Sequence, residues 1–158
     1  MIADTPPAAH APSFAHVANG FAFDIAAPPA RVAPLFGPQG ERAWAGGHWD
    51  PAFLYPLPAT DVQGAVFTVP HGSLTSVWVN TVFDLAGGHM QYVCVLPGIM
   101  AATIDVRLSP AGNGTHVEVD YTRTALREDV NADVTAMGEK DRQSGPQWQS
   151  AIDKALGL

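Results

Sequence analysis

Cysteine is almost absent from this chain, since Cys94 is the only one among 158 residues. A disulfide within the chain needs two cysteines and a thiolate metal cluster needs several, so both are excluded. We interpret Cys94 as a small buried apolar residue rather than a catalytic thiolate. A single cysteine suits a reducing compartment, and we expect a cytoplasmic protein.

Positive charge is also scarce. Eight Lys and Arg residues stand against fifteen Asp and Glu residues, which gives a formal net charge of -7. Such a chain repels phosphate backbones and anionic membrane surfaces unless a basic patch overrides the net charge, and the sequence has no such patch. We therefore expect no nucleic-acid partner.

Long apolar runs are missing as well. A membrane-spanning helix needs about 20 consecutive apolar residues, so we expect no membrane insertion. The first residues lack the basic and apolar stretches of a signal peptide. We interpret residues 1–13 as a flexible N-terminal arm and residues 14–158 as one domain, because 47% hydrophobic residues suffice for one core.

Alternation of polar and apolar residues is the main pattern that is present, and it runs from residue 74 to residue 126. A period of two is typical of antiparallel strands, and the Gly and Pro pairs between the runs predict turns. An earlier run, before Pro28 and Pro29, predicts a first strand. The predicted strands are 14–25, 64–69, 76–84, 90–96, 100–109 and 116–126.

The last of these strands predicts its own register. Val117, Val119 and Tyr121 share one face, while Glu118 and Asp120 share the other. Burying two unpaired carboxylates would cost several kcal/mol, so we expect the first set to face the core.

Two kinds of helix complete the pattern. Short helices are predicted at 30–36 and 39–45, after the first strand. Beyond Leu126 the period becomes helical, and Gly145-Pro146 predicts a bend between Asp141 and Gln147 because proline lacks a backbone donor. The apolar stripe of this tail contains Val130, Val134, Met137, Trp148, Ile152 and Ala155.

Four segments carry a resemblance to a known superfamily: GERAWAGGHWDPAFLYP at 40–56, WVNTVFD at 78–84, YVCVLPG at 92–98 and THVEVDYTRTAL at 115–126. With the order of elements, they resemble bacterial-type members of the START-like superfamily, also called SRPBCC or helix-grip proteins. The resemblance implies an α+β fold. In it a curved antiparallel sheet of about seven strands, with two short helices after strand 1, wraps round a long C-terminal helix and encloses a ligand cavity.

The sequence assigns no catalytic residue, metal or cofactor. The six histidines show no metal-binding spacing, and no phosphate-binding loop is present. His48 is either an exposed loop residue or an acid or base at the cavity mouth. Glu41 and Arg42 are interpreted as capping or solvating a short helix.

Cavity-lining residues follow from the inner strand faces, the helix stripe and the aromatic residues of the resemblance. Tyr92, Tyr121 and Arg123 are either polar groups that orient a ligand or core residues with satisfied hydrogen bonds. The predicted ligand-binding set is Trp49, Phe67, Val79, Tyr92, Ala102, Ile104, Val119, Tyr121, Arg123, Val134, Met137, Asp141 and Trp148.

Two functions follow. The first is binding or transport of a small hydrophobic molecule that is lipid-like, aromatic or polyketide-like. The alternative is a cyclase, dehydratase or hydrolase in which Tyr92, Tyr121, Arg123 or Asp141 acts on such a molecule. A role with a protein partner is a third hypothesis, and a homodimer is one expected assembly.

Overall fold

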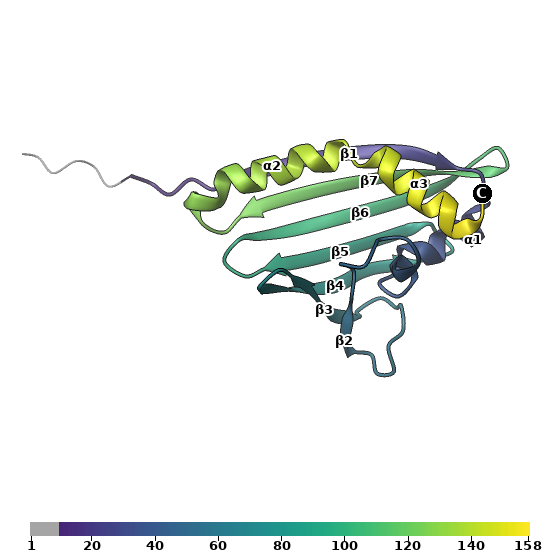
Figure 1. Cartoon of the computed structure of the whole chain (residues 1–158), viewed down its shortest axis with the longest axis horizontal. Helices are drawn as coiled ribbons and strands as arrows, with labels where there is room; N and C mark the ends of the chain where they lie inside the picture. Colours follow the sequence, from purple (N-terminus) through teal and green to yellow (C-terminus); the bar gives the residue numbers. More distant parts are fainter. Residues whose placement is uncertain (1–9) are drawn as a thin grey trace, which may run out of the picture.

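The computed structural model describes residues 10–158, so most of the predicted arm at 1–13 lies outside the described residues. One curved antiparallel sheet of seven strands dominates the fold, in the order β1-β7-β6-β5-β4-β3-β2 (Figure 1). No helix of the described chain is long and apolar enough to cross a membrane. The strands are β1 (His16–Ile25), β2 (Ala52–Tyr55), β3 (Val66–His71), β4 (Leu74–Asp84), β5 (His89–Leu96), β6 (Met100–Ala111) and β7 (Gly114–Ala125).

The alternating pattern placed six of these strands within a few residues of their observed bounds, and the curved antiparallel sheet is confirmed. The strand that it missed is β2, which pairs with β3 alone at the sheet edge. It has four residues between Pro51 and Pro56, and so short a segment shows no alternation.

The register of β7 is confirmed. Val117 and Val119 are buried, whereas Glu118 and Asp120 are exposed. Tyr121, on the buried face, is partly buried. The concave face of the sheet is therefore the apolar one, as the alternation predicted.

The segment between β1 and β2 has to connect opposite edges of the sheet. It contains the helix α1 (Pro29–Val32) and the 3-10 helices η1 (Ala33–Phe36) and η2 (Gly40–Ala43). Both helical regions were predicted from sequence. The first, predicted at 30–36, is helical over 29–36 but becomes a 3-10 helix in its second half, and the second, predicted at 39–45, is the shorter 3-10 helix η2. Pro34 accounts for part of this, since it offers no backbone N–H for a continued α-helix.

The C-terminal tail forms two helices, α2 (Asn131–Arg142) and α3 (Gly145–Leu156), after the short 3-10 helix η3 (Glu128–Val130). The predicted bend is confirmed, because the break falls at residues 143–144 with Pro146 in the first turn of α3. In Figure 1, α2 follows β1 and β7, and α3 turns away toward the far end of the sheet.

Close approach of α2 to β1 depends on Gly138. A Cβ atom at this position would lie 2.7 Å from the Asn19 side-chain nitrogen and 2.9 Å from a Val17 methyl group. Both distances are shorter than van der Waals contact. The absence of a side chain therefore sets the distance between helix and sheet.

We expect Gly138→Leu to lower the free energy of unfolding by about 2 kcal/mol, because the added side chain has to push α2 from β1. Ala136→Leu is the matched control on the same helix, since Ala136 is exposed. It should change stability by less than about 0.5 kcal/mol. Urea unfolding followed by circular dichroism measures both. Equal effects of the two substitutions would contradict this account of the helix packing.

Candidate functional site

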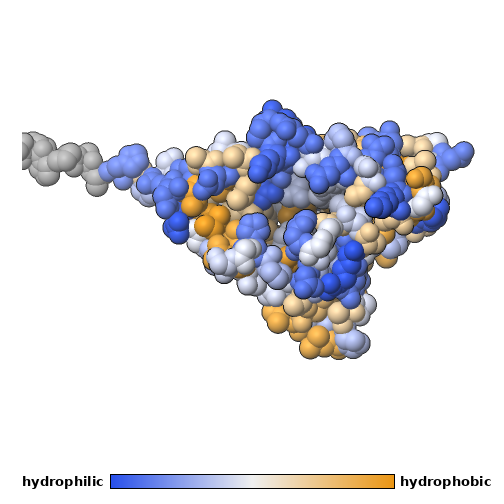
Figure 2. Space-filling view, in the orientation of Figure 1, coloured by the Kyte–Doolittle hydropathy of each residue, from blue (hydrophilic) through white to orange (hydrophobic). Residues whose placement is uncertain are grey.

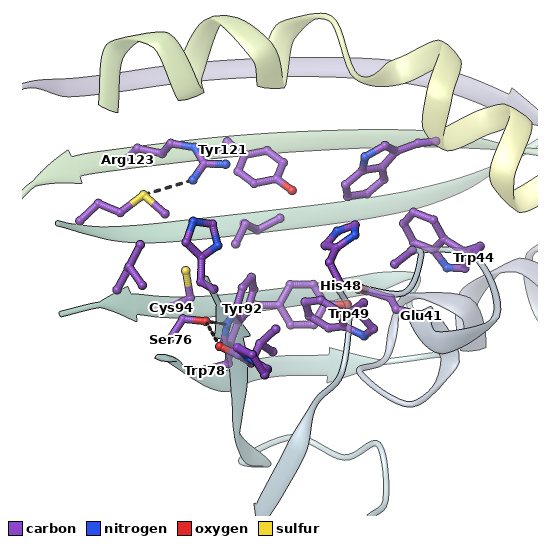
Figure 3. Close-up of a pocket in the computed structure, with 18 of the residues that line it drawn as sticks. Glu41, Trp44, His48, Trp49, Ser76, Trp78, Tyr92, Cys94, Tyr121 and Arg123 are labelled. Carbon is purple, nitrogen blue, oxygen red and sulfur yellow. Dashed lines mark hydrogen bonds between the residues drawn. The ribbon is translucent and has the colours of Figure 1, made fainter. Parts of the chain in front are cut away.

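A cavity of about 400 Å³ lies between the concave face, α3 and the β1–β2 connection. Its hollow is visible near the centre of the face shown in Figure 2. Side chains from the connection, from strands β3 to β7 and from α3 line it, and Figure 3 shows how they converge. The connection contributes Glu41, Trp44, His48 and Trp49, and α3 contributes Gln147, Trp148 and Ala151.

Two aromatic clusters border this cavity, and three rings of each cluster line it. In the first, which we call the helix-side cluster, the Trp44 and Trp148 rings lie 4.9 Å apart; in the second, the edge-side cluster, the Trp49 and Trp78 rings lie 5.3 Å apart. The helix-side cluster consists of Phe21, Phe23, Phe36, Trp44, Tyr121 and Trp148. The edge-side cluster consists of Trp49, Phe53, Phe67, Trp78 and Tyr92.

Most indole N–H groups of these walls are already used by the protein. The Trp44 N–H donates to the Leu35 carbonyl at 2.8 Å, and the Trp49 N–H donates to the Pro38 carbonyl at 2.9 Å. The Trp78 N–H donates to the hydroxyl of Ser76 at 2.8 Å. These rings therefore offer the cavity their apolar surfaces.

The Arg123 guanidinium is likewise already bonded within the protein. Its Nε and Nη2 donate to the two carboxylate oxygens of Asp141 at 2.6 and 2.8 Å, and its guanidinium lies 4.8 Å from the centre of the Tyr121 ring. Burial alone would lower the pKa of Arg123, but the hydrogen bonds and charge of Asp141 outweigh it and raise the pKa. The pair is a neutral unit at the cavity wall.

Glu41 is the carboxyl group of the cavity. Burial raises its pKa well above the ordinary value, and the charge of Asp61 raises it further, while the nearby Tyr92 hydroxyl opposes the rise. Among the ion pairs of residues 10–158, none involves Glu41. The neighbouring Arg42 does not pair with it, since the Arg42 Nη1 donates a hydrogen bond to the Asp50 carboxylate at 3.0 Å. Glu41 is therefore held toward its neutral form.

Asp61 fixes the position of the segment that carries Glu41. Its carboxylate accepts hydrogen bonds from the backbone N–H groups of Gln39 at 2.8 Å and Gly40 at 3.0 Å, at the start of η2. Gly40 is required there, because a Cβ atom would collide with the Pro34 carbonyl oxygen. This close packing holds η2 against the loop that follows β2.

Tyr92 points from β5 toward Glu41 (Figure 3). Tyr92 is 4% exposed, and its buried hydroxyl has no hydrogen-bond partner of good geometry. Burial and then the charge of Glu41 raise the pKa of Tyr92, so the hydroxyl keeps its proton at neutral pH. Cys94, two residues along, is also buried, and this raises the pKa of its thiol to about 11. It is therefore protonated and not a nucleophile at neutral pH.

Comparison with known proteins rests on structure. No family model matches the chain, and no curated protein matches it in sequence. Ara h 8.0201 superposes with a TM-score of 0.62 at 14% identity, covering 90% of this chain and 99% of its own. The chain has the helix-grip fold.

Two further helix-grip structures agree over nearly the whole chain. Protein MLL2253 from Mesorhizobium loti gives a TM-score of 0.64 at 15% identity, covering 89% of this chain and 97% of its own. Norcoclaurine synthase from Thalictrum flavum, solved with dopamine and hydroxybenzaldehyde, gives 0.62 at 11% identity, covering 91% and 88%. At these identities the likeness establishes the fold alone.

Part of the predicted ligand-binding set comes together in this helix-grip cavity. Tyr92, Ile104, Tyr121 and Arg123 line it from the strands, and Trp148 lines it from α3. Trp49 and the exposed His48 lie on the connection where the sequence placed the mouth of the cavity. Four aromatic residues of the predicted set, Trp49, Tyr92, Tyr121 and Trp148, therefore line the cavity.

Other members of the set lie elsewhere. Val79 falls on the opposite face from Trp78, and Phe67 is buried behind the Trp78 ring. Ala102, Val119 and two residues of α2, Val134 and Met137, belong to the hydrophobic core and do not line the cavity. Asp141 reaches the site through Arg123. The break before α3 explains why Val134 and Met137 do not line the cavity while Trp148 does. Before the break α2 packs on β1 and β7, and after it α3 faces the cavity.

The sequence analysis did not predict Glu41 as a residue of the site. We interpreted Glu41 as a capping or solvated residue of a short helix, but it lines the cavity beside Tyr92. Nothing in its local sequence indicates this, because Asp61 positions η2 from 22 residues beyond Gln39. Trp44 and Trp78 carried a signal, since their segment is rich in aromatic residues.

Removal of the Asp141 carboxylate should destabilise the fold. Asp141→Ala leaves the Arg123 guanidinium charged and unpaired where side-chain exposures are 14% and 9%, so we expect a loss of about 3 kcal/mol in the free energy of unfolding. Asp129→Ala is the control, because Asp129 and Arg127 form an exposed pair of the same geometry. Chemical unfolding should show no measurable change in the free energy of unfolding of Asp129→Ala. Similar losses in both variants would argue against a special role for the buried pair.

Glu41 should also give stability a pH dependence. Its folded-state pKa lies above the unfolded value of 4.5, so its contribution is fully present below pH 4.5 and is lost as pH rises through the raised pKa. Glu41→Gln cannot titrate. We therefore expect the variant to match the wild type near pH 4 and to exceed its stability near pH 8, measured by urea unfolding at both pH values. The other titratable groups are the same in both proteins, so their effects cancel in the difference between variant and wild type. A difference independent of pH would contradict the assignment.

Proposed function

We propose that the protein binds a small hydrophobic ligand, aromatic or polyketide-like, in the cavity of the helix-grip fold. The observation that carries this proposal is a space of about 400 Å³ between two aromatic clusters. That size lies within the range of small-molecule sites, and rings whose N–H groups are already bonded favour apolar contact. A flat molecule fits between two aromatic walls by stacking.

The fold neighbours support this class of ligand. Norcoclaurine synthase holds dopamine and hydroxybenzaldehyde, both of which are small aromatic molecules. For this chain we propose that Trp44, Trp49, Trp78, Trp148 and Tyr121 contact the ligand. A cytoplasmic location, the absence of a nucleic-acid partner and a homodimer stay predictions.

A second candidate is an enzyme that acts on the same ligand, as a cyclase, dehydratase or hydrolase. The observation that favours it is Glu41, a carboxyl group held toward its protonated form inside an apolar cavity, as general acids are. Tyr92 adds a protonated hydroxyl beside it. Of the four residues that the sequence put forward, Tyr92, Tyr121, Arg123 and Asp141, the last two are paired with each other and are less available.

One experiment separates the two functions. The purified protein is incubated with an extract, re-isolated, and its bound small molecules are identified by mass spectrometry before and after incubation. A carrier releases the molecule that it took up, whereas an enzyme releases an altered one. Failure to retain any aromatic or polyketide-like molecule would argue against both.

Filling the cavity should abolish binding without unfolding the protein. Ile104 lines the cavity, so Ile104→Trp places an indole in the empty space at a stability cost of about 1–3 kcal/mol. Val95→Trp is the matched control, since Val95 is 37% exposed on the other face of the sheet. We expect uptake of 2-acetonaphthone, measured by equilibrium dialysis, to be lost in the first variant and kept in the second. Retained uptake in Ile104→Trp would place the ligand elsewhere.

A further inference from the structure

Two polar groups of the cavity, Glu41 and the Tyr92 hydroxyl, face each other without a hydrogen bond of good geometry between them. The Tyr92 hydroxyl is buried and accepts or donates no hydrogen bond of good geometry. Glu41 lines the same space and has no cation opposite it among the described residues. Buried polar groups are nearly always hydrogen-bonded, so the Tyr92 hydroxyl at the cavity wall is free to bond a molecule that occupies the cavity.

We propose that Glu41 and Tyr92 together form the binding site for the carbonyl oxygen of a ketone or aldehyde on the bound ligand. This inference rests on the proposed binding function and names the polar group that the ligand has to carry. The remainder of the ligand lies against the aromatic clusters.

The chemistry of the two groups selects a neutral acceptor. A phenol and a neutral carboxyl group each donate one hydrogen bond, and a carbonyl oxygen has two lone pairs that accept both. A cationic ligand would require ionised Glu41, which burial and the charge of Asp61 oppose. Among the described residues, Arg123 is the only arginine or lysine that lines the cavity, and Asp141 neutralises it, which disfavours an anionic ligand.

The surroundings of Glu41 give this site a pH dependence. Asp61 faces it from the loop after β2, Tyr92 from β5 and Tyr121 from β7, and His48 lines the same cavity from the connection. Ionisation of Glu41 removes one of the two donors and adds a negative charge beside the carbonyl oxygen. Affinity for a carbonyl ligand therefore falls as pH rises through the pKa of Glu41.

The test uses two probes of nearly equal shape, 2-acetonaphthone and 2-isopropenylnaphthalene, in which a C=CH₂ group replaces the carbonyl. Equilibrium dialysis gives the affinity ratio of ketone to hydrocarbon for the wild type and for Tyr92→Phe, which keeps the ring and loses the hydroxyl. We expect the ratio to fall about fivefold in the variant, as loss of one hydrogen bond predicts. Hydrocarbon binding in the same variant reports that the cavity is intact.

Substitutions of Glu41 separate donation from charge. Glu41→Gln keeps an N–H donor, so the ratio should persist but lose its dependence on pH; Glu41→Leu should lower the ratio about fivefold. A measurement without variants is the infrared stretch of ¹³C-carbonyl acetonaphthone, which should move to lower frequency on binding than in hexane.

The outcomes are distinguishable. If both probes bind and the ratio is the same in the wild type, Tyr92→Phe and Glu41→Leu, the carbonyl site is wrong and the proposed function stands. An unshifted carbonyl stretch in the bound wild type overturns the inference in the same way. If neither probe binds the wild type, the proposed function fails and the inference fails with it.

Discussion

The concave face of the sheet is wider than the helices that cover it, and this mismatch governs the rest of the structure. Seven strands at the usual spacing span about 29 Å, whereas one helix is about 10 Å across. Here α2 lies along β1 and β7, and Gly138 brings it close to β1. The apolar surface of β4 to β6 therefore needs another cover, and the aromatic clusters leave part of that space empty.

The connection between β1 and β2 provides that cover because of the strand order. Since β1 and β2 lie at opposite edges, the intervening chain has to pass across the sheet, and it brings Glu41, Trp44 and Trp49 over the concave face. Asp61 and Gly40 hold this passage in place. The strands thus provide rigid walls, while Glu41, whose pKa burial raises, lies on the connection that these walls support.

Much of the fold could be predicted from the sequence, because alternation and proline act locally. Val119 inward and Glu118 outward follow from the pleat, and the break before Pro146 follows from its missing donor. The site was less predictable. Glu41 owes its place to Asp61, which is distant in sequence, and the break that was correctly predicted also turns α2 away from the cavity, so that Met137 does not line it. β2 was missed because four residues show no period.

The distribution of tryptophan has a practical consequence. The chain contains four tryptophans, and Trp44, Trp49, Trp78 and Trp148 all line the cavity. None is left on a distant surface to contribute a constant background signal. The tryptophan fluorescence of the protein therefore comes entirely from residues that line the candidate site, so it reports directly on a molecule that enters the cavity.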